Sequence, residues 1–263
     1  MVVFEDEFTE LSDKWKKVGT HTNFSISAEN NKLKFTFGWM EDPSTPHVKR
    51  AWAGVVYDEP FDLTRKRVSI TIDMTPKFRP LEGVGLYYNR MGFMVGNKKL
   101  PPNVGLPISA DGLPCDPFFK AIGCVTNYIG GIPADVLGFK FDGYDYNIFG
   151  RVMAGYPPLE MMGEYAPNKV NLIETGAPVA EYVPHFDLSK AYLYLVFFTT
   201  EVAKTTSARL LPDFGYVDYV RIDVLPPEPL TAFFGQTMAV TLTTTLMMMN
   251  AMLIIRGLRL IRW

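Results

Sequence analysis

The segment Val68-Ser-Ile-Thr-Ile-Asp-Met74 alternates apolar and polar residues. Because consecutive side chains of a β-strand point to opposite faces, the alternation predicts a strand with one buried face. Lys32–Phe37 and Tyr216–Val224 alternate in the same way, while Ala191–Thr199 is almost wholly apolar, as expected of a central strand. No convincing long amphipathic helix precedes residue 229, so many strands and few helices predict an antiparallel sandwich or barrel.

Composition excludes several classes of protein. The chain has 263 residues, of which 48% are hydrophobic and 14% aromatic, so it can bury a core and is not disordered. Its 26 Lys and Arg nearly balance its 28 Asp and Glu, and no basic cluster marks the body of the chain, so we expect no nucleic-acid partner. The N-terminus has neither the basic start nor the apolar stretch of a cleavable signal peptide.

The middle of the chain, from Asn97 to Lys169, is rich in Pro and Gly. We expect a long irregular insertion with a few short strands. Loops on a rigid sheet often carry binding sites. The alternative is that this segment covers one sheet or contacts a partner.

The C-terminal region predicts a single transmembrane helix. Leu230–Ile255 contains no Asp, Glu, Lys or Arg, and as a helix it would cross a hydrocarbon core of about 30 Å. The residues that follow suit a lipid interface: Arg256, Arg259, Arg262 and Trp263. The predicted organisation is a β-sandwich over residues 1–225, a Pro-rich spacer over 226–229 and the membrane segment over 230–263. The alternative is a buried helix or hairpin.

Two polar residues bear on the partners of that segment. Gln236 and Asn250 would need hydrogen-bond partners inside a membrane, which predicts other transmembrane subunits besides the lipid bilayer. The protein is thus expected to be a single-pass membrane protein. The arginines favour placing the large domain outside the cytoplasm, whereas the missing signal peptide argues against its export, so its side of the membrane stays open.

The order of several motifs resembles concanavalin A-like lectin/glucanase domains. Phe4-Glu-Asp-Glu-Phe-Thr-Glu-Leu-Ser-Asp-Lys-Trp15 resembles the first strand and turn of that family. Phe61–Thr64 and Phe186–Ser189 each lead into a strand in a similar way, and Gly215–Ile222 resembles the closing strand. The resemblance spans residues 3 to 224 with the middle unmatched, and it implies a jelly-roll sandwich of two antiparallel sheets. Fold alone does not fix function.

The catalytic residues of the β-glucanases in that superfamily have no counterpart in this chain. Those enzymes resemble one another in a Glu-x-Asp-x-x-Glu strand, and a retaining hydrolase needs two carboxyls about 5–5.5 Å apart. Placing Asp73 in the Asp position puts Thr71 and Pro76 in the two Glu positions. We therefore expect that the protein is not an enzyme and has no catalytic residues.

Three groups of residues are candidates for binding or cross-linking. Aromatic side chains that suit stacking on sugars are Trp39, Trp52, Tyr87, Tyr88, Tyr144 and Tyr146, with Asn89 and Asp145 as polar partners and core packing as the alternative. Oxygen ligands for calcium, the one cofactor considered, are Asp142, Asp145 and Asn147, with an ordinary turn as the alternative. Cys115 and Cys124 could close a disulfide or remain two buried thiols.

Three functions compete on these grounds. The predicted one is a non-catalytic, membrane-anchored structural or accessory subunit of a multi-subunit membrane complex or a virion. It rests on the polar groups in the anchor, the long covering segment and the missing carboxyl pair. The alternatives are a membrane-tethered, lectin-like module that binds glycans and, on fold analogy alone, a diverged glycoside hydrolase.

Overall fold

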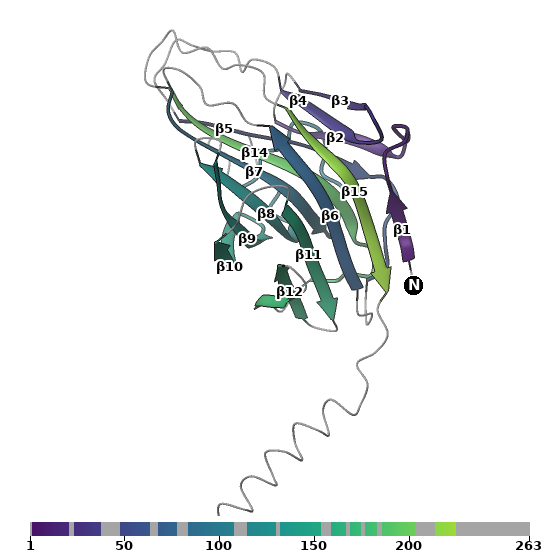
Figure 1. Ribbon diagram of the computed structural model, residues 1–263. Helices are drawn as coiled ribbons and strands as arrows, with labels where there is room; N and C mark the ends of the chain where they lie inside the picture. Colours follow the sequence, from purple (N-terminus) through teal and green to yellow (C-terminus); the bar gives the residue numbers. More distant parts are fainter. Residues whose placement is uncertain are drawn as a thin grey trace, which may run out of the picture. The chain divides into compact units, whose positions relative to one another are not determined.

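The computed structural model describes residues 2–20, 24–37, 48–63, 68–77, 84–107, 115–129, 132–153, 159–166, 169–174, 177–182, 186–203 and 214–224. Every regular element in these ranges is a β-strand, and the strands form two sheets (Figure 1). Sheet A consists of β1 (Val2–Asp6), β3 (Phe24–Ala28), β4 (Leu33–Phe37), β6 (Val68–Lys77), β11 (Leu159–Ala166), β12 (Lys169–Glu174), β13 (Ala177–Tyr182) and β15 (Phe214–Val224). Sheet B consists of β2 (Trp15–Gly19), β5 (Val48–Tyr57), β7 (Val84–Gly96), β8 (Lys120–Ile129), β9 (Ile132–Asp142), β10 (Asp145–Met153) and β14 (Tyr192–Ala203).

The strand order makes the fold antiparallel and non-sequential. Sheet A runs β13-β12-β11-β6-β15-β4-β3, with β1 also pairing with β15, and sheet B runs β10-β9-β8-β7-β14-β5-β2. The pairs at the centres of both sheets are antiparallel, for example β15 with β6 and β14 with β7. The chain passes between the sheets after β4, β5 and β6, so both layers are built together. The predicted all-β antiparallel sandwich is confirmed.

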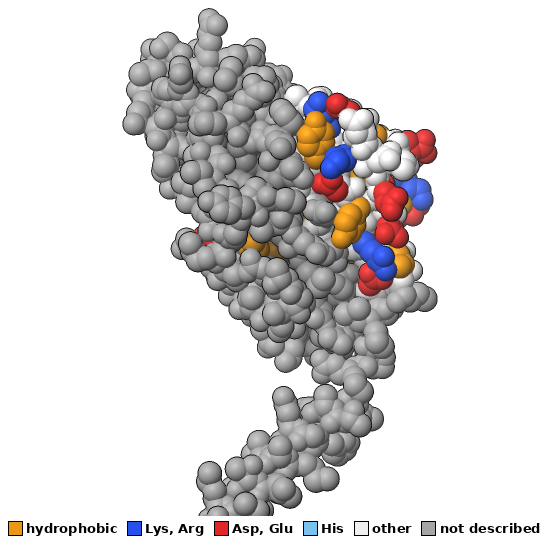
Figure 2. All heavy atoms as spheres, viewed as in Figure 1, with side chains coloured by type: hydrophobic (Ala, Val, Ile, Leu, Met, Phe, Trp, Pro, Cys, Tyr) orange, Lys and Arg blue, Asp and Glu red, His pale blue; other side chains and the backbone are white. Residues whose placement is uncertain are grey.

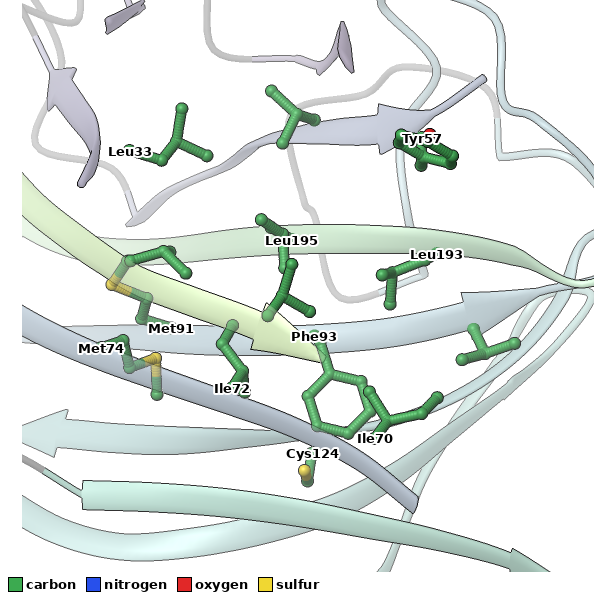
Figure 3. Packing of buried hydrophobic residues seen from close by; sticks show 14 of the residues in the cluster. Leu33, Tyr57, Ile70, Ile72, Met74, Met91, Phe93, Cys124, Leu193 and Leu195 are labelled. Carbon is green, nitrogen blue, oxygen red and sulfur yellow. The ribbon is translucent and has the colours of Figure 1, made fainter. Parts of the chain in front are cut away.

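The predicted strand faces meet in a core between the two sheets. Ile70, Ile72 and Met74 are fully buried, as the alternation predicted. Figure 3 shows Ile72, Met74 and Ile70 of β6 packed near Phe93 and Leu195 of sheet B. Each large apolar side chain buried in this way contributes roughly 1.5–3 kcal/mol, so this layer is the main source of the stability of the sandwich.

The opening motif builds a fixed corner at the edge of the sandwich. Asp6 Oδ2 accepts a hydrogen bond from Trp15 Nε1–H at 2.8 Å, and Asp6 Oδ1 accepts one from the Phe8 N–H at 2.8 Å. Phe8 and Trp15 are both buried, and their ring centroids lie 5.9 Å apart. The acidic residue thus satisfies the polar groups of the turn while the aromatic rings enter the core.

The prediction of an irregular insertion over Asn97–Lys169 is wrong for most of its length, because β8, β9, β10 and β11 lie within it. Glycine is common in loops, but Gly123 lies in the middle of β8. A Cβ atom there would lie 2.2 Å from the carbonyl oxygen of Phe93, so close strand packing requires a glycine. The described residues outside strands in the first part of this segment are 97–107 and 115–119.

Described charges on sheet A largely neutralise one another. Figure 2 shows basic side chains beside acidic ones on one face of the molecule. Lys34 pairs with Glu29 at 2.7 Å, and Arg221 pairs with Asp223 at 2.6 Å. Exposed pairs of this kind add little stability, and they leave no strong field of one sign on these residues.

The C-terminal predictions lie outside the described residues. The contacts of the chain divide it into Met1–Leu225 and Pro226–Trp263, and every described residue belongs to the first unit. The spacer, the membrane segment and its residues Gln236, Asn250, Arg256, Arg259, Arg262 and Trp263 are therefore not described. Within the described residues, no helix has the length and apolar character needed to span a membrane. Membrane localisation, bilayer contact and transmembrane partners stay predictions.

Candidate functional site

The face of sheet B that points away from sheet A, here called the outer face, is lined by apolar side chains. Trp52, Tyr194 and Phe198 are buried there. They alternate along β5 and β14 with residues of the inter-sheet core such as Val55 and Leu195. Both faces of sheet B are buried along the described part of β14. This explains why Ala191–Thr199 is almost wholly apolar instead of alternating.

Residues 97–107 and 115–119, here called the covering segment, lie against this outer face. Leu100, Leu106 and Phe119 are buried in the same cluster as the strand residues. Tyr194 is the main attachment, because its hydroxyl donates to the Lys98 carbonyl at 2.6 Å and accepts from the Leu100 N–H at 2.9 Å. The interpretation that the middle of the chain covers a sheet is confirmed for this part.

Trp52 belongs to this packing. Its indole Nε1–H donates to the carbonyl of Val104 at 2.9 Å, and the side chain is fully buried. A ring enclosed in this way has no face for a ligand, so the proposed sugar-stacking role of Trp52 is wrong and core packing holds. The covering segment encloses the ring, and its path could not be predicted from the strand pattern.

Four polar residues interrupt the apolar outer face and form what we call the polar cluster: Arg90, Asn127, Asp135 and Tyr146. The register places Arg90 opposite Asn127 and Asn127 opposite Asp135. Arg90 Nε–H donates to Asn127 Oδ1 at 3.2 Å, and Arg90 Nη1 donates to the Tyr146 hydroxyl at 3.4 Å. Asn127 is 6% exposed and Asp135 1% exposed. Buried polar groups of this kind are expensive, which makes the cluster a candidate for function.

The surroundings of Tyr146 favour its neutral form. Its ring lies against Phe139 and Phe141, with centroids 5.9 and 5.3 Å away. Burial raises the pKa of the Tyr146 hydroxyl, Arg90 lowers it and Asp135 raises it, with a net upward shift. Tyr146 therefore stays protonated at neutral pH and can donate a hydrogen bond.

The polar cluster does not follow as a group from the sequence, although Asn127 and Asp135 leave a detectable pattern. Asn127 and Asp135 occupy positions whose neighbours two residues away, Val125 and Leu137, are apolar and buried. A polar residue that breaks an apolar face is the indication of such a site. The grouping of four strands, however, follows only from their register.

A second feature is a pair of exposed rings on adjoining turns, which we call the aromatic platform. Phe118 is 75% exposed and Tyr144 is 67% exposed. Tyr144 was predicted as a sugar-stacking residue, whereas Phe118 was missed. Large exposed aromatic side chains are uncommon on a monomer, and they often mark binding sites.

Backbone contacts hold the two turns of the platform together. The Gly143 N–H donates to the Phe119 carbonyl at 3.0 Å, and the Phe118 N–H donates to Asp116 Oδ1 at 2.9 Å. Gly143 has φ +64, and a Cβ atom there would lie 2.7 Å from the Pro117 carbonyl oxygen. Only glycine meets both requirements, so the turn that carries Tyr144 is fixed against the turn that carries Phe118.

Paired charges surround the platform. Lys98 Nζ lies 2.5 Å from Asp116 Oδ2 and 5.7 Å from the centroid of the Phe118 ring, and Lys120 Nζ lies 3.1 Å from Asp142 Oδ1. Burial alone would raise the pKa of Asp116, but hydrogen bonds from Lys98 and from the backbone N–H groups of Phe118 and Phe119 lower it overall. The rings are thus flanked by donors and acceptors with little net charge.

Of the predicted calcium ligands, Asp142 and Asp145 flank the turn that joins β9 to β10, whereas Asn147 lies on β10 opposite Lys140. Asp142 and Asp145 are opposite each other in the register and close the hairpin, and Asp142 pairs with Lys120. Asp142, Asp145 and Asn147 are exposed. The described residues contain no group of three or more His, Cys, Asp or Glu side chains that could hold a metal ion. The turn interpretation accounts for these residues, and calcium binding stays a prediction.

The predicted disulfide between Cys115 and Cys124 is wrong, because the structure contains both cysteines without a bond between them. Cys124 points into the inter-sheet core, whereas Cys115 belongs to the covering segment on the opposite side of sheet B. The backbone of the sheet separates the two side chains. Burial strongly raises the pKa of the Cys124 thiol, so it is an unreactive core residue.

The remaining candidates cannot be placed as side chains. Tyr87, Tyr88 and Asn89 lie on β7, where Asn89 is opposite Thr199 and Tyr128, but their side chains are outside the described part of the structure. Trp39 lies outside the described residues altogether. Their roles in binding stay predictions.

Comparison with known proteins supports the architecture. No protein-family model and no curated protein sequence matches the chain. Among solved structures, a β-1,3-1,4-glucanase (lichenase) from a mouse hindgut metagenome has a TM-score of 0.51 at 13% identity, covering 84% of this chain and 99% of its own. A GlcNAcα1-4Gal-releasing endo-β-galactosidase from Clostridium perfringens has a TM-score of 0.51 at 11% identity, covering 84% and 62%. A Bacillus subtilis protein of unknown function with a galectin-like fold has a TM-score of 0.51 at 13% identity, covering 85% and 96%.

These likenesses correct two predictions. The prediction of a non-catalytic structural subunit, and with it the expectation that the protein is not an enzyme, is contradicted because a glucanase and a galactosidase are among the similar structures. Identities of this size show the fold alone. The chain therefore has a jelly-roll β-sandwich fold like that of these solved structures.

Proposed function

We propose that this protein binds glycans and that the aromatic platform is the surface on which the sugar lies. The observation that carries the proposal is the pair of exposed rings, Phe118 and Tyr144, on two turns fixed to each other by the Gly143 N–H bond to the Phe119 carbonyl. The likeness to a lichenase and an endo-β-galactosidase supports a glycan as the ligand.

The chemistry of the platform matches that of a sugar. A pyranose ring has an apolar face of C–H groups and a polar rim of hydroxyls. The exposed aromatic rings offer apolar area, and the neighbouring Lys98, Asp116, Lys120 and Asp142 offer donors and acceptors to hydroxyls. Because the turns are already ordered, binding requires little additional loss of conformational entropy.

The test is a binding assay against neutral β-linked gluco- and galacto-oligosaccharides. Phe118→Ala and Tyr144→Ala should each weaken binding by about two- to twelvefold, since an aromatic contact contributes roughly 0.5–1.5 kcal/mol. Val3→Ala is the matched control, because Val3 is also apolar and exposed but lies on β1 of sheet A. Equal affinity of both platform variants and the wild type would refute the proposal.

Cleavage of the bound glycan is the second candidate, and the buried carboxyl of Asp135 on the outer face favours it. A glycosidase uses a carboxyl as its general acid. Release of reducing ends can be followed in the same samples. An activity that Asp135→Asn abolishes without loss of binding would support this candidate, and no release from any bound oligosaccharide would count against it.

A further inference from the structure

We propose that Arg90 binds a carboxylate carried by a sugar ring, so that the preferred ligand is an acidic saccharide of the hexuronate class. This inference rests on the proposed glycan binding and specifies its ligand. It comes from the polar cluster, which is distinct from the aromatic platform.

Arg90 holds a central place on sheet B. It lies on β7, the middle strand of the sheet, between Phe198 of β14 and Asn127 of β8. Its side chain is half-buried, while Phe198 beside it is buried. A positive charge is therefore held next to an apolar wall without being cut off from solvent.

The partners of this guanidinium are neutral. Within the described residues, Arg90 donates to the amide oxygen of Asn127 and to the hydroxyl of Tyr146, and it forms no ion pair. A guanidinium has five N–H groups, and these two bonds use only two of them. Charges in apolar surroundings are normally paired, so this site is suited to an anion supplied by a ligand.

The groups around Arg90 suit a carboxylate in particular. The fork of N–H donors on arginine matches the two oxygens of a carboxylate. The Tyr146 hydroxyl stays protonated because of its raised pKa, so it adds a further donor. Asp135 lies opposite Asn127 on β9, so its carboxyl is one strand further from Arg90 than the Asn127 amide is.

The chain connects this site with the platform. Tyr146, which contacts Arg90, follows Tyr144 by two residues on the β9–β10 hairpin. Two residues of a strand span about 7 Å. An oligosaccharide that lies on Tyr144 can therefore extend towards Tyr146 and present a carboxylate to Arg90.

The experiment compares a cello-oligosaccharide with the same oligomer oxidised at C6 to glucuronate, which differ only in the carboxylates. The wild type should bind the oxidised oligomer about tenfold more tightly, as expected for one charge-assisted hydrogen-bonded contact, and the preference should shrink with added salt. Arg90→Gln should reduce the preference to less than about twofold, while Arg90→Lys keeps part of it.

Controls separate this inference from the proposed function. Lys14→Gln removes one positive charge at an exposed pair with Glu59 and should leave the preference unchanged. Thermal unfolding of each variant checks that it is folded. Equal affinity for both oligomers, a preference that survives in Arg90→Gln, or competition by acetate at equal concentration would overturn the inference, although glycan binding at the platform could still hold. Binding of neither oligomer would overturn both proposals.

Discussion

Tyr194 should be the residue whose hydroxyl contributes most to holding the covering segment against sheet B. Tyr194→Phe removes a single oxygen atom but breaks two hydrogen bonds, to the Lys98 carbonyl at 2.6 Å and from the Leu100 N–H at 2.9 Å. The ring itself stays packed against Phe119, 5.9 Å away between centroids. The substitution thus tests the polar attachment without opening a large cavity.

The expected loss of stability follows from the two hydrogen bonds that the Lys98 carbonyl and the Leu100 N–H no longer form. Each hydrogen bond contributes about 1 kcal/mol net, and a buried partner left without a bond costs more. Leu100 is 4% exposed, so water can replace the lost bond only if the segment moves. We expect the free energy of unfolding to fall by about 2–3 kcal/mol.

Urea unfolding measures this loss, and amide hydrogen exchange at Leu100 shows whether the covering segment opens locally. Tyr192→Phe is the matched control, because Tyr192 lies two residues earlier on β14 and its hydroxyl forms no hydrogen bond with the described residues. It should change stability by less than about 0.5 kcal/mol. Equal stability of the two variants, or unchanged exchange at Leu100 in Tyr194→Phe, would refute the reasoning.

Three further substitutions test other parts of the account. Gly123→Ala should destabilise the protein more than Gly96→Ala. A Cβ at Gly123 would lie 2.2 Å from the backbone carbonyl oxygen of Phe93, whereas one at Gly96 would lie 2.7 Å from the Phe119 side chain. Equal unfolding midpoints would contradict this. Burial in the folded protein raises the pKa of the Cys124 thiol above its usual 9.0, so as the pH rises the thiol loses its proton in the unfolded chain before it does in the folded one. The free energy of unfolding should therefore fall above pH 9, by up to about 1.4 kcal/mol per pH unit. Cys124→Ala should have a shallower fall between pH 9 and 10 in unfolding measurements, and identical slopes would disprove the assignment. Gly143→Ala should weaken glycan binding in titrations, because its φ of +64 and the Pro117 carbonyl force the Tyr144 turn to move; wild-type affinity would show that the turns need not be fixed.

The sheets could be predicted because their faces are encoded locally. Ile70, Ile72 and Met74 alternate with polar residues and are all buried. The opening motif could also be recognised, since Asp6 and Trp15 form its turn through a direct hydrogen bond. Local patterns of this kind do not depend on distant parts of the chain.

Features that depend on distant contacts could not be predicted. Gly123 resembles a loop residue until the backbone of β7 is seen next to it. Trp52 resembles a binding residue until the covering segment is seen to enclose it. Phe118 and Phe119 are adjacent and identical in type, yet the first is exposed and the second buried.

The polar cluster and the aromatic platform also depend on contacts between distant parts of the chain. Arg90, Asn127, Asp135 and Tyr146 come from four different strands, and only the register brings them together. Tyr144 could be chosen from the sequence as an aromatic residue in a turn. Its partner Phe118 could not, because the contact between the two turns runs through the backbone of Gly143 and Phe119.

The measurement that most directly tests glycan binding is a calorimetric titration of the wild type and of a Phe118→Ala/Tyr144→Ala double variant with one oligosaccharide to which the wild type binds. With both rings removed, we expect affinity to fall by about five- to 150-fold, since two aromatic contacts contribute roughly 1–3 kcal/mol. The unfolding midpoint should stay close to that of the wild type because both side chains are exposed. A folded double variant that binds the oligosaccharide as tightly as the wild type would contradict the account.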